Sequence, residues 1–140
     1  MTQLPDGYRE RVHNSEFTDL CGPFFEKIED GKQTELALRI SSKHSNLRGI
    51  THGGLLVTIA DSAIGDAVAH AYGDEFGLVT VSLTSEFYRP AKMGDWVIAR
   101  ASVQKQGRSM AFADCFLYVD DQKIFRATGV FAIVERQGRR

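Results

Sequence analysis

The chain has 140 residues, of which 43% are hydrophobic and 25% charged, and its net charge is -1. These values are typical of one globular domain that buries a core, and they argue against whole-chain disorder and against nucleic-acid binding driven by bulk positive charge. The two cysteines, Cys21 and Cys115, lie far apart in no metal-ligand spacing, which argues against a disulfide scaffold and a zinc site. The polar N-terminus predicts no signal peptide, and two aspartates interrupt the longest apolar stretch (55–71), so we expect no membrane span and a cytoplasmic location.

Residues 1–140 show no linker, repeat or low-complexity tract, and we treat them as a single domain. Its N-terminal segment, residues 1–30, is predicted to be helical, with one or two short helices in residues 4–20. The core is predicted to span residues 31–136, followed by a solvated basic tail. Residues 33–40 alternate between apolar and polar side chains, which predicts a strand, and the polar residues 41–51 predict a loop.

A long helix is predicted to follow the tripeptide His52-Gly53-Gly54. The stretch after it is rich in alanine and leucine and is apolar on nearly every side, which favours a helix buried at the centre of the domain. Gly73 is a natural stop for this helix, because glycine readily adopts the backbone conformation of a helix C-terminus.

After Gly73 the hydrophobic period changes to two, which predicts strands at 78–84, 95–103, 110–119 and 123–134. Short turns at 106–108 and 120–122 predict hairpins. Consecutive hairpins make this part of the sheet antiparallel, and the single long helix must cover one of its faces. The predicted fold class is therefore α+β.

Asp61 stands in the middle of the predicted apolar helix, where an unpaired carboxylate costs several kcal/mol. A lone aspartate at such a position more often faces solvent or pairs with a partner. Asp66, nearer the end of the helix, is interpreted in that structural way. Asp61 becomes a catalytic candidate only together with the residues around the start of the helix.

At that start, two glycines let a ligand approach the backbone closely, and the first N–H groups of the helix point outward. Such a site can stabilise the oxyanion of an acyl-transfer reaction, although a His-Gly-Gly tripeptide alone is weak support. Asp61 lies roughly 12 Å from Gly53 along the helix axis, too far for both to reach one carbonyl carbon. The pattern therefore predicts a site shared across a two-fold interface, with Gly53 of one chain facing Asp61 of another.

Three separated motifs then resemble the hotdog-fold thioesterases of the PaaI type: residues 46–54 with Asp61, residues 88–95 and residues 105–112. The resemblance covers residues 33–134. It implies a hotdog fold, in which an antiparallel sheet wraps around one long central helix. It also implies hydrolysis of acyl-CoA thioesters, without a metal or organic cofactor, by a homodimer. Whether two dimers pair further stays open, with a tetramer favoured by the resemblance.

The resemblance implies a role for each site residue. Asp61 acts as the general base, with nucleophilic attack as the alternative. The Gly53 N–H and the side chain of Asn46 polarise the thioester oxygen, and His52 lies near the departing sulfur. Taken alone, Asn46 would only form a loop turn.

A hydroxyl group on the next strand is implied to hold the water, and Thr80 aligns with that position. Ser82 is the alternative, because it is expected on the same strand face. The CoA phosphates are assigned to residues of the two later motifs, which as isolated residues would be solvated turn side chains: Arg89, Lys92, Arg108 and Ser109.

Two competing functions are weighed against the thioesterase. A non-catalytic acyl-CoA sensor is the main alternative, and the complete set of Asn46, Gly53 and Asp61 argues against it. A hotdog hydratase would need a different Asp/His arrangement. The acyl group stays open between aryl or phenylacetyl groups, slightly favoured, and medium or long chains.

Overall fold

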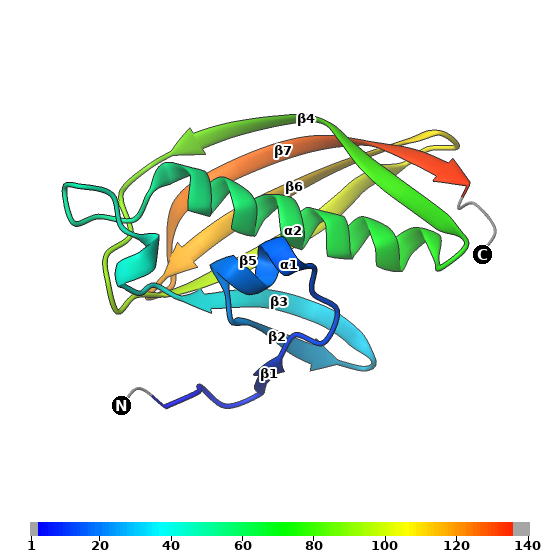
Figure 1. Cartoon of the computed structure of the whole chain (residues 1–140). Helices are drawn as coiled ribbons and strands as arrows, with labels where there is room; N and C mark the ends of the chain where they lie inside the picture. Colours follow the sequence, from blue (N-terminus) through cyan, green and yellow to red (C-terminus); the bar gives the residue numbers. More distant parts are fainter. Residues whose placement is uncertain (1–2, 136–140) are drawn as a thin grey trace.

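The computed structural model describes residues 3–135 and shows a seven-stranded antiparallel sheet curved around one long helix (Figure 1). This confirms the predicted α+β architecture. In chain order the elements are β1 (Tyr8–Glu10), α1 (Glu16–Cys21), β2 (Phe24–Glu29), β3 (Lys32–Arg39), a short 3₁₀ turn (Ser42–His44), α2 (Gly53–Tyr72), β4 (Phe76–Phe87), β5 (Trp96–Gln106), β6 (Met110–Val119) and β7 (Gln122–Glu135). The predicted basic tail, residues 136–140, lies outside the described residues.

Helix α2 begins and ends where the sequence predicts. His52 caps its N-terminus, and Gly73 ends it with a φ of 92°, a conformation that favours glycine. Its buried side chains repeat every three or four residues and pack onto the sheet: Leu55, Leu56, Ile59, Ala60, Ala63, Ile64 and Val68.

The opposite face of α2 is more open than predicted. It carries small and polar residues that are half-buried or exposed, including Asp61, Ser62, Gly65, Asp66 and Ala69. The helix is central, but the expectation of burial on nearly every side is wrong for this face. No helix within residues 3–135 combines the length and the apolar content that crossing a membrane requires.

The strand order is β1-β2-β3-β5-β6-β7-β4. Hairpins join β5 to β6 and β6 to β7, and the second turns through Asp120 and Asp121, both with positive φ. Strands β4 and β5, by contrast, form no hairpin with each other, because β4 pairs with β7 at the edge of the sheet. The chain returns across the sheet through residues 88–95, held there by hydrogen bonds from the Tyr88 N–H to the Ile124 carbonyl and from the Thr51 N–H to the Ala91 carbonyl.

The prediction of a helical N-terminal segment is correct only for α1, whose first turn is capped by Ser15 and Thr18. The rest of the segment forms β1 and β2, which extend the sheet beyond β3. The short β2 buries Phe24 and Glu26 on one face while Phe25 lies on the other. This alternation is that of a strand, but it covers too few residues to stand out without its partner β3.

The core encloses Cys115 on β6, which is fully buried, whereas Cys21 is half-buried at the end of α1. Burial, with a smaller contribution from the neighbouring Asp114 charge, raises the pKa of the Cys115 thiol to about 12. At pH 8 we therefore expect a thiol reagent to modify Cys21 first. Cys115 should react roughly a hundredfold more slowly, because the reagent reaches it only when the core unfolds locally. Time-resolved mass spectrometry measures the two rates.

A Cys21→Ser variant is the control, and rapid labelling of its remaining thiol would contradict this expectation. The same pKa shift lowers stability at alkaline pH. Between about pH 9 and pH 12 the unfolded chain releases a thiol proton that the folded chain keeps, so the free energy of unfolding falls over that range.

Candidate active site

The N-terminus of α2 presents backbone donors at the protein surface. The Nδ1 atom of His52 accepts a hydrogen bond from the Gly54 N–H at 3.0 Å, which leaves the proton of the neutral imidazole on Nε2. The Gly53 N–H, first in the helix, has no acceptor among residues 3–135. A Cβ at Gly53 would lie 3.3 Å from the Phe87 ring, so glycine keeps this approach uncrowded. The helix thus offers one free amide and one imidazole donor at its tip.

Asn46 shapes the loop that leads into this helix. Its Oδ1 accepts hydrogen bonds from the Arg48 N–H at 2.8 Å and from the Ile50 N–H at 3.4 Å. Its backbone N–H bonds to the Ile50 carbonyl at 2.8 Å. The side-chain oxygen therefore builds the loop turn. Within residues 3–135 the Nδ2 group has no acceptor, and it is the part of Asn46 that can donate to a ligand.

Asp61 lies on the open face of α2, where β4 crosses the helix. Its Oδ1 accepts a hydrogen bond from the Thr80 hydroxyl at 2.8 Å, and its Oδ2 has no donor within residues 3–135. Both residues line a cavity of about 540 Å³. A carboxylate with one oxygen anchored and the other free can orient a water molecule and accept its proton.

Ser82 faces the other side of the sheet. A β-bulge shifts the register so that Thr80 pairs with Phe131 and Ser82 with Val130. Neighbouring residues on a strand point to opposite faces, so their two partners on β4 do as well. The expectation that Thr80 and Ser82 share a face is therefore wrong, and Thr80 is the one in contact with Asp61.

One chain does not bring Gly53 and Asp61 together. They stand eight residues apart on the same helix, or about 12 Å along its axis. Asp61 lines its cavity with residues from the middle of α2, whereas His52 and Gly54 line a separate cavity of about 390 Å³ beside Phe17 of α1.

The residues expected to bind CoA phosphates also fall into two groups. Arg89 and Lys92 follow β4 near the start of α2, where Lys92 forms an isolated β-bridge with Ile50. Arg108 and Ser109 lie in the β5–β6 turn near the other end, where the Tyr72 hydroxyl donates to the Gly107 carbonyl at 2.5 Å. All four residues are exposed. The length of α2 separates the two groups within one chain.

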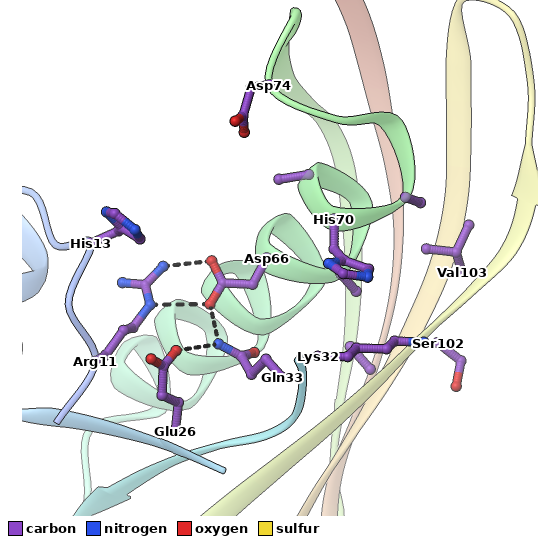
Figure 2. Close-up of a pocket in the computed structure, with 14 residues that line it drawn as sticks. Arg11, His13, Glu26, Lys32, Gln33, Asp66, His70, Asp74, Ser102 and Val103 are labelled. Atoms are coloured by element: carbon purple, nitrogen blue, oxygen red, sulfur yellow. Dashed lines mark hydrogen bonds and ion pairs between the residues drawn. The ribbon is translucent and has the colours of Figure 1, made fainter. Parts of the chain in front are cut away.

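A polar cluster that the sequence did not predict lies beside the Asp61 cavity. Arg11, just after β1, forms a two-point ion pair with Asp66 of α2, and Gln33 joins Asp66 to Glu26 (Figure 2). The pair agrees with the structural interpretation of Asp66, but a local pattern does not indicate a partner 55 residues away. Within residues 3–135, no three His, Cys, Asp or Glu side chains are grouped so that they could hold a metal ion.

Comparison with known proteins identifies relatives of this chain. A Pseudomonas aeruginosa protein that carries the provisional name esterase PA0474 is 39% identical over 131 residues, which cover 94% of this chain and 98% of that protein. The mouse acyl-coenzyme A thioesterase 13 is 33% identical over 76 residues, which cover 54% of each protein.

Solved structures show the same fold. A variant of the phenylacetic acid degradation protein PaaI from Thermus thermophilus superimposes with a TM-score of 0.74 at 24% identity, covering 84% of this chain and 98% of that one. The BH2602 protein of Bacillus halodurans, solved with CoA, has a TM-score of 0.68 at 28% identity and covers 73% and 68%. The model of the family described as the thioesterase superfamily matches residues 48–125, the region from the Asn46 loop through α2 to the start of β7. The chain therefore belongs to the thioesterase superfamily, and its sheet wrapped around α2 is the hotdog fold of that family.

Proposed function

We propose that the protein is an acyl-CoA thioesterase in which Asp61 activates the hydrolytic water. The observation that carries the proposal is the Asp61 carboxylate, anchored by Thr80 at 2.8 Å and facing a cavity, in a chain of the thioesterase superfamily. The mouse relative named as an acyl-CoA thioesterase and the Bacillus halodurans structure with CoA support a CoA thioester as the substrate class. The acyl group is aryl, arylacetyl or aliphatic.

Each site residue has a defined task in this reaction. Asp61 Oδ2 accepts a proton from water as the water oxygen attacks the thioester carbon. The negative charge that develops on the carbonyl oxygen receives hydrogen bonds from the Gly53 N–H and from Asn46 Nδ2. The C–S bond then breaks, and the electron pair leaves with the CoA sulfur, to which His52 Nε2–H can donate. The products are a carboxylic acid and free CoA.

This chemistry requires two chains, because one chain holds Gly53 and Asp61 about 12 Å apart. Strand β4 offers the surface for pairing. It is a 12-residue edge strand, and its residues Val79 and Val81 are 56% and 54% exposed. A long apolar edge strand is a template for another strand.

Two β4 strands that pair antiparallel around a two-fold axis set the two α2 helices antiparallel as well. Phe87 lies beside Gly53 at one end of β4, and Thr80 bonds to Asp61 nearer the other end. The two-fold axis therefore brings the Gly53 tip of one helix toward the Asp61 of its partner. We propose this homodimer as the active unit and, as the family resemblance implies, two such dimers as a tetramer.

The same two-fold symmetry places the two groups of proposed CoA-binding residues, one from each chain, on the same side of the dimer. Antiparallel helices bring the N-terminal end of one chain, with Arg89 and Lys92, to the side where the partner's helix ends, with Arg108 and Ser109. Basic side chains from both chains can then bind the phosphates of one CoA. We further propose a reaction without metal or organic cofactor, since the thiolate is a good leaving group, and a location in the cytoplasm.

Thr80 is expected to set the orientation of the Asp61 carboxylate. Thr80→Val removes the hydroxyl at nearly constant volume, and we expect kcat to fall about tenfold or more with little change in KM. Thr80→Ser keeps the hydroxyl and should retain most of the activity. Ser82→Ala is the matched control on the same strand. A Ser82→Ala protein as impaired as Thr80→Val would show that the wrong hydroxyl has been assigned.

The proposed function is tested by release of free CoA thiol from a panel of aryl-, arylacetyl- and straight-chain acyl-CoA substrates. Purified protein should release one thiol per thioester hydrolysed, and light scattering should show a dimer or tetramer. Acyl-CoA binding without thiol release would replace the enzyme with a binding module. A monomer with full activity would overturn the shared site.

A further inference from the structure

The Asp61 cavity extends away from the carboxylate along α2. Its helix wall includes the small residues Gly65 and Ala69, which follow Asp61 at intervals of four and therefore lie on the same side of the helix, and Gly73 lines the cavity just after the helix ends. The facing wall contains the side chains of Leu78 and Phe131. A Cβ at Gly65 would already touch both, at 3.8 Å and 4.0 Å. Because Gly65 has no side chain, this part of the cavity stays unfilled, in a passage that starts at the Asp61 carboxylate and has an apolar wall.

A second cavity of about 1030 Å³ lies next to this passage, on the side of α2 that faces β2, β3 and β5. It is the pocket shown in Figure 2, and His70, Lys32 and Ser102 line its far part. Four residues line both cavities: Arg11, Asp66, Ala69 and Asp74. Residues that line two cavities stand at the boundary between them, so the Arg11–Asp66 ion pair forms part of this boundary.

The pair is held firmly. Arg11 Nε and Nη2 donate to the two Asp66 oxygens at 3.0 Å and 2.6 Å, and Nη1 donates to Asn14 Oδ1 at 3.0 Å. The Arg11 backbone N–H bonds to the Phe24 carbonyl at 2.9 Å, and Gln33 donates to Asp66 at 2.9 Å.

Burial distinguishes the Arg11–Asp66 pair from an ordinary surface salt bridge. The side chains of Arg11 and Asp66 are only 11% and 23% exposed. An alkyl chain that reached the pair would have to lie against desolvated charges or break their hydrogen bonds, and both are unfavourable.

We propose that the Arg11–Asp66 pair limits the length of the acyl group that the enzyme accepts. Compact acyl groups end in the passage beside Gly65, Leu78 and Phe131, before the pair. Long aliphatic chains are excluded, because the pair keeps them out of the second cavity. This inference rests on the proposed thioesterase function and makes Arg11 a specificity-determining residue that takes no part in bond cleavage.

The test compares kcat/KM along a straight-chain series from butyryl-CoA to palmitoyl-CoA. Wild-type activity should fall steeply beyond a particular chain length, and Arg11→Ala should move that limit to longer chains. Each newly buried methylene is worth about fourfold in binding, so three of them should raise kcat/KM for the longer substrates roughly sixtyfold. Activity toward the shortest substrate should stay within about threefold, because Arg11 does not touch the reacting atoms.

Arg9→Ala is the matched control. Arg9 lies two residues away and also forms an ion pair, with Glu26 at 3.0 Å, but it lines neither cavity. The double variant Arg11→Ala/Asp66→Ala removes both charges and leaves no unpaired carboxylate, so it should also shift the limit if the single variant folds poorly.

The outcomes separate this inference from the function on which it rests. No thiol release from any substrate by the wild type would overturn both proposals. Hydrolysis with the same chain-length profile in the wild type and both Arg11 variants would overturn only the role of the pair. Equal wild-type rates on butyryl-CoA and palmitoyl-CoA would also overturn the role of the pair. This measurement uses the wild-type protein alone, so it does not depend on whether a variant folds.

Discussion

Asp61→Asn is expected to lower kcat for acyl-CoA hydrolysis roughly 10²–10⁴-fold, the range that a positioned general base contributes. Asparagine has nearly the same shape, and its Oδ1 can still accept the Thr80 hydroxyl, so the fold and the cavity should persist. The amide cannot take the proton of the attacking water. KM should therefore change much less than kcat, and initial rates of thiol release measure both.

Asp114→Asn is the control for this substitution. Asp114 lies on β6, lines none of the three cavities described above, and accepts a hydrogen bond from Gln104 that asparagine can also accept. Its variant should keep wild-type activity. If the Asp61→Asn protein hydrolyses acyl-CoA within a few-fold of the wild-type rate, Asp61 is not the catalytic base.

A single turnover in ¹⁸O-labelled water distinguishes the general base from the nucleophile. With a general base, the heavy oxygen enters the carboxylic acid during the first turnover. With a nucleophile, Asp61 displaces the CoA thiolate to form a mixed anhydride, and hydrolysis at the Asp61 carbonyl carbon leaves an Asp61 oxygen in the first acid and the heavy label in the Asp61 peptide. Trapping of the anhydride with hydroxylamine detects a nucleophile whose anhydride is instead attacked at the acyl carbon. Mass spectrometry of the acid and of the digested protein reads both outcomes.

Gly53→Pro is expected to lower kcat about 10²–10³-fold, because it deletes one oxyanion donor, the backbone N–H. The backbone tolerates this change unusually well. Gly53 is the first residue of α2, where proline is favoured, and His52 before it has φ -60° and ψ 131°, as residues preceding proline prefer. Gly53→Ala adds the same Cβ beside Phe87 but keeps the N–H, so it should remain much more active. Equal loss in both variants would mean that crowding, not the missing donor, lowers the rate.

Mixing two inactive proteins tests whether the site is shared between chains. A dimer of one Asp61→Asn chain and one Gly53→Pro chain has one intact site, formed by Gly53 of the first chain and Asp61 of the second. After random subunit exchange of equal amounts, half of the dimers are mixed, and about a quarter of wild-type activity should return. If both groups came from the same chain, the mixture would stay inactive.

The sequence was sufficient for the features that depend on local pattern. The apolar run that begins after two glycines and ends at Gly73 predicted α2, and the two-residue period predicted the strands after it. The distance between Gly53 and Asp61 follows from helix geometry, so the sequence alone already predicts a site shared between two chains. Local pattern is informative here because the period of apolar residues reports which face of an element is buried.

Folding in three dimensions supplied the rest. The pairing of β4 with β7, the bulge that turns Thr80 and not Ser82 toward Asp61, and the Arg11–Asp66 pair all join residues far apart in the chain. The N-terminal strands β1 and β2 were missed for the same reason, since strands this short are stabilised mainly by their neighbours. Such contacts depend on how whole elements pack against one another. A short stretch of sequence does not predict that packing, because a strand with the same alternating pattern can pair with any of several other strands.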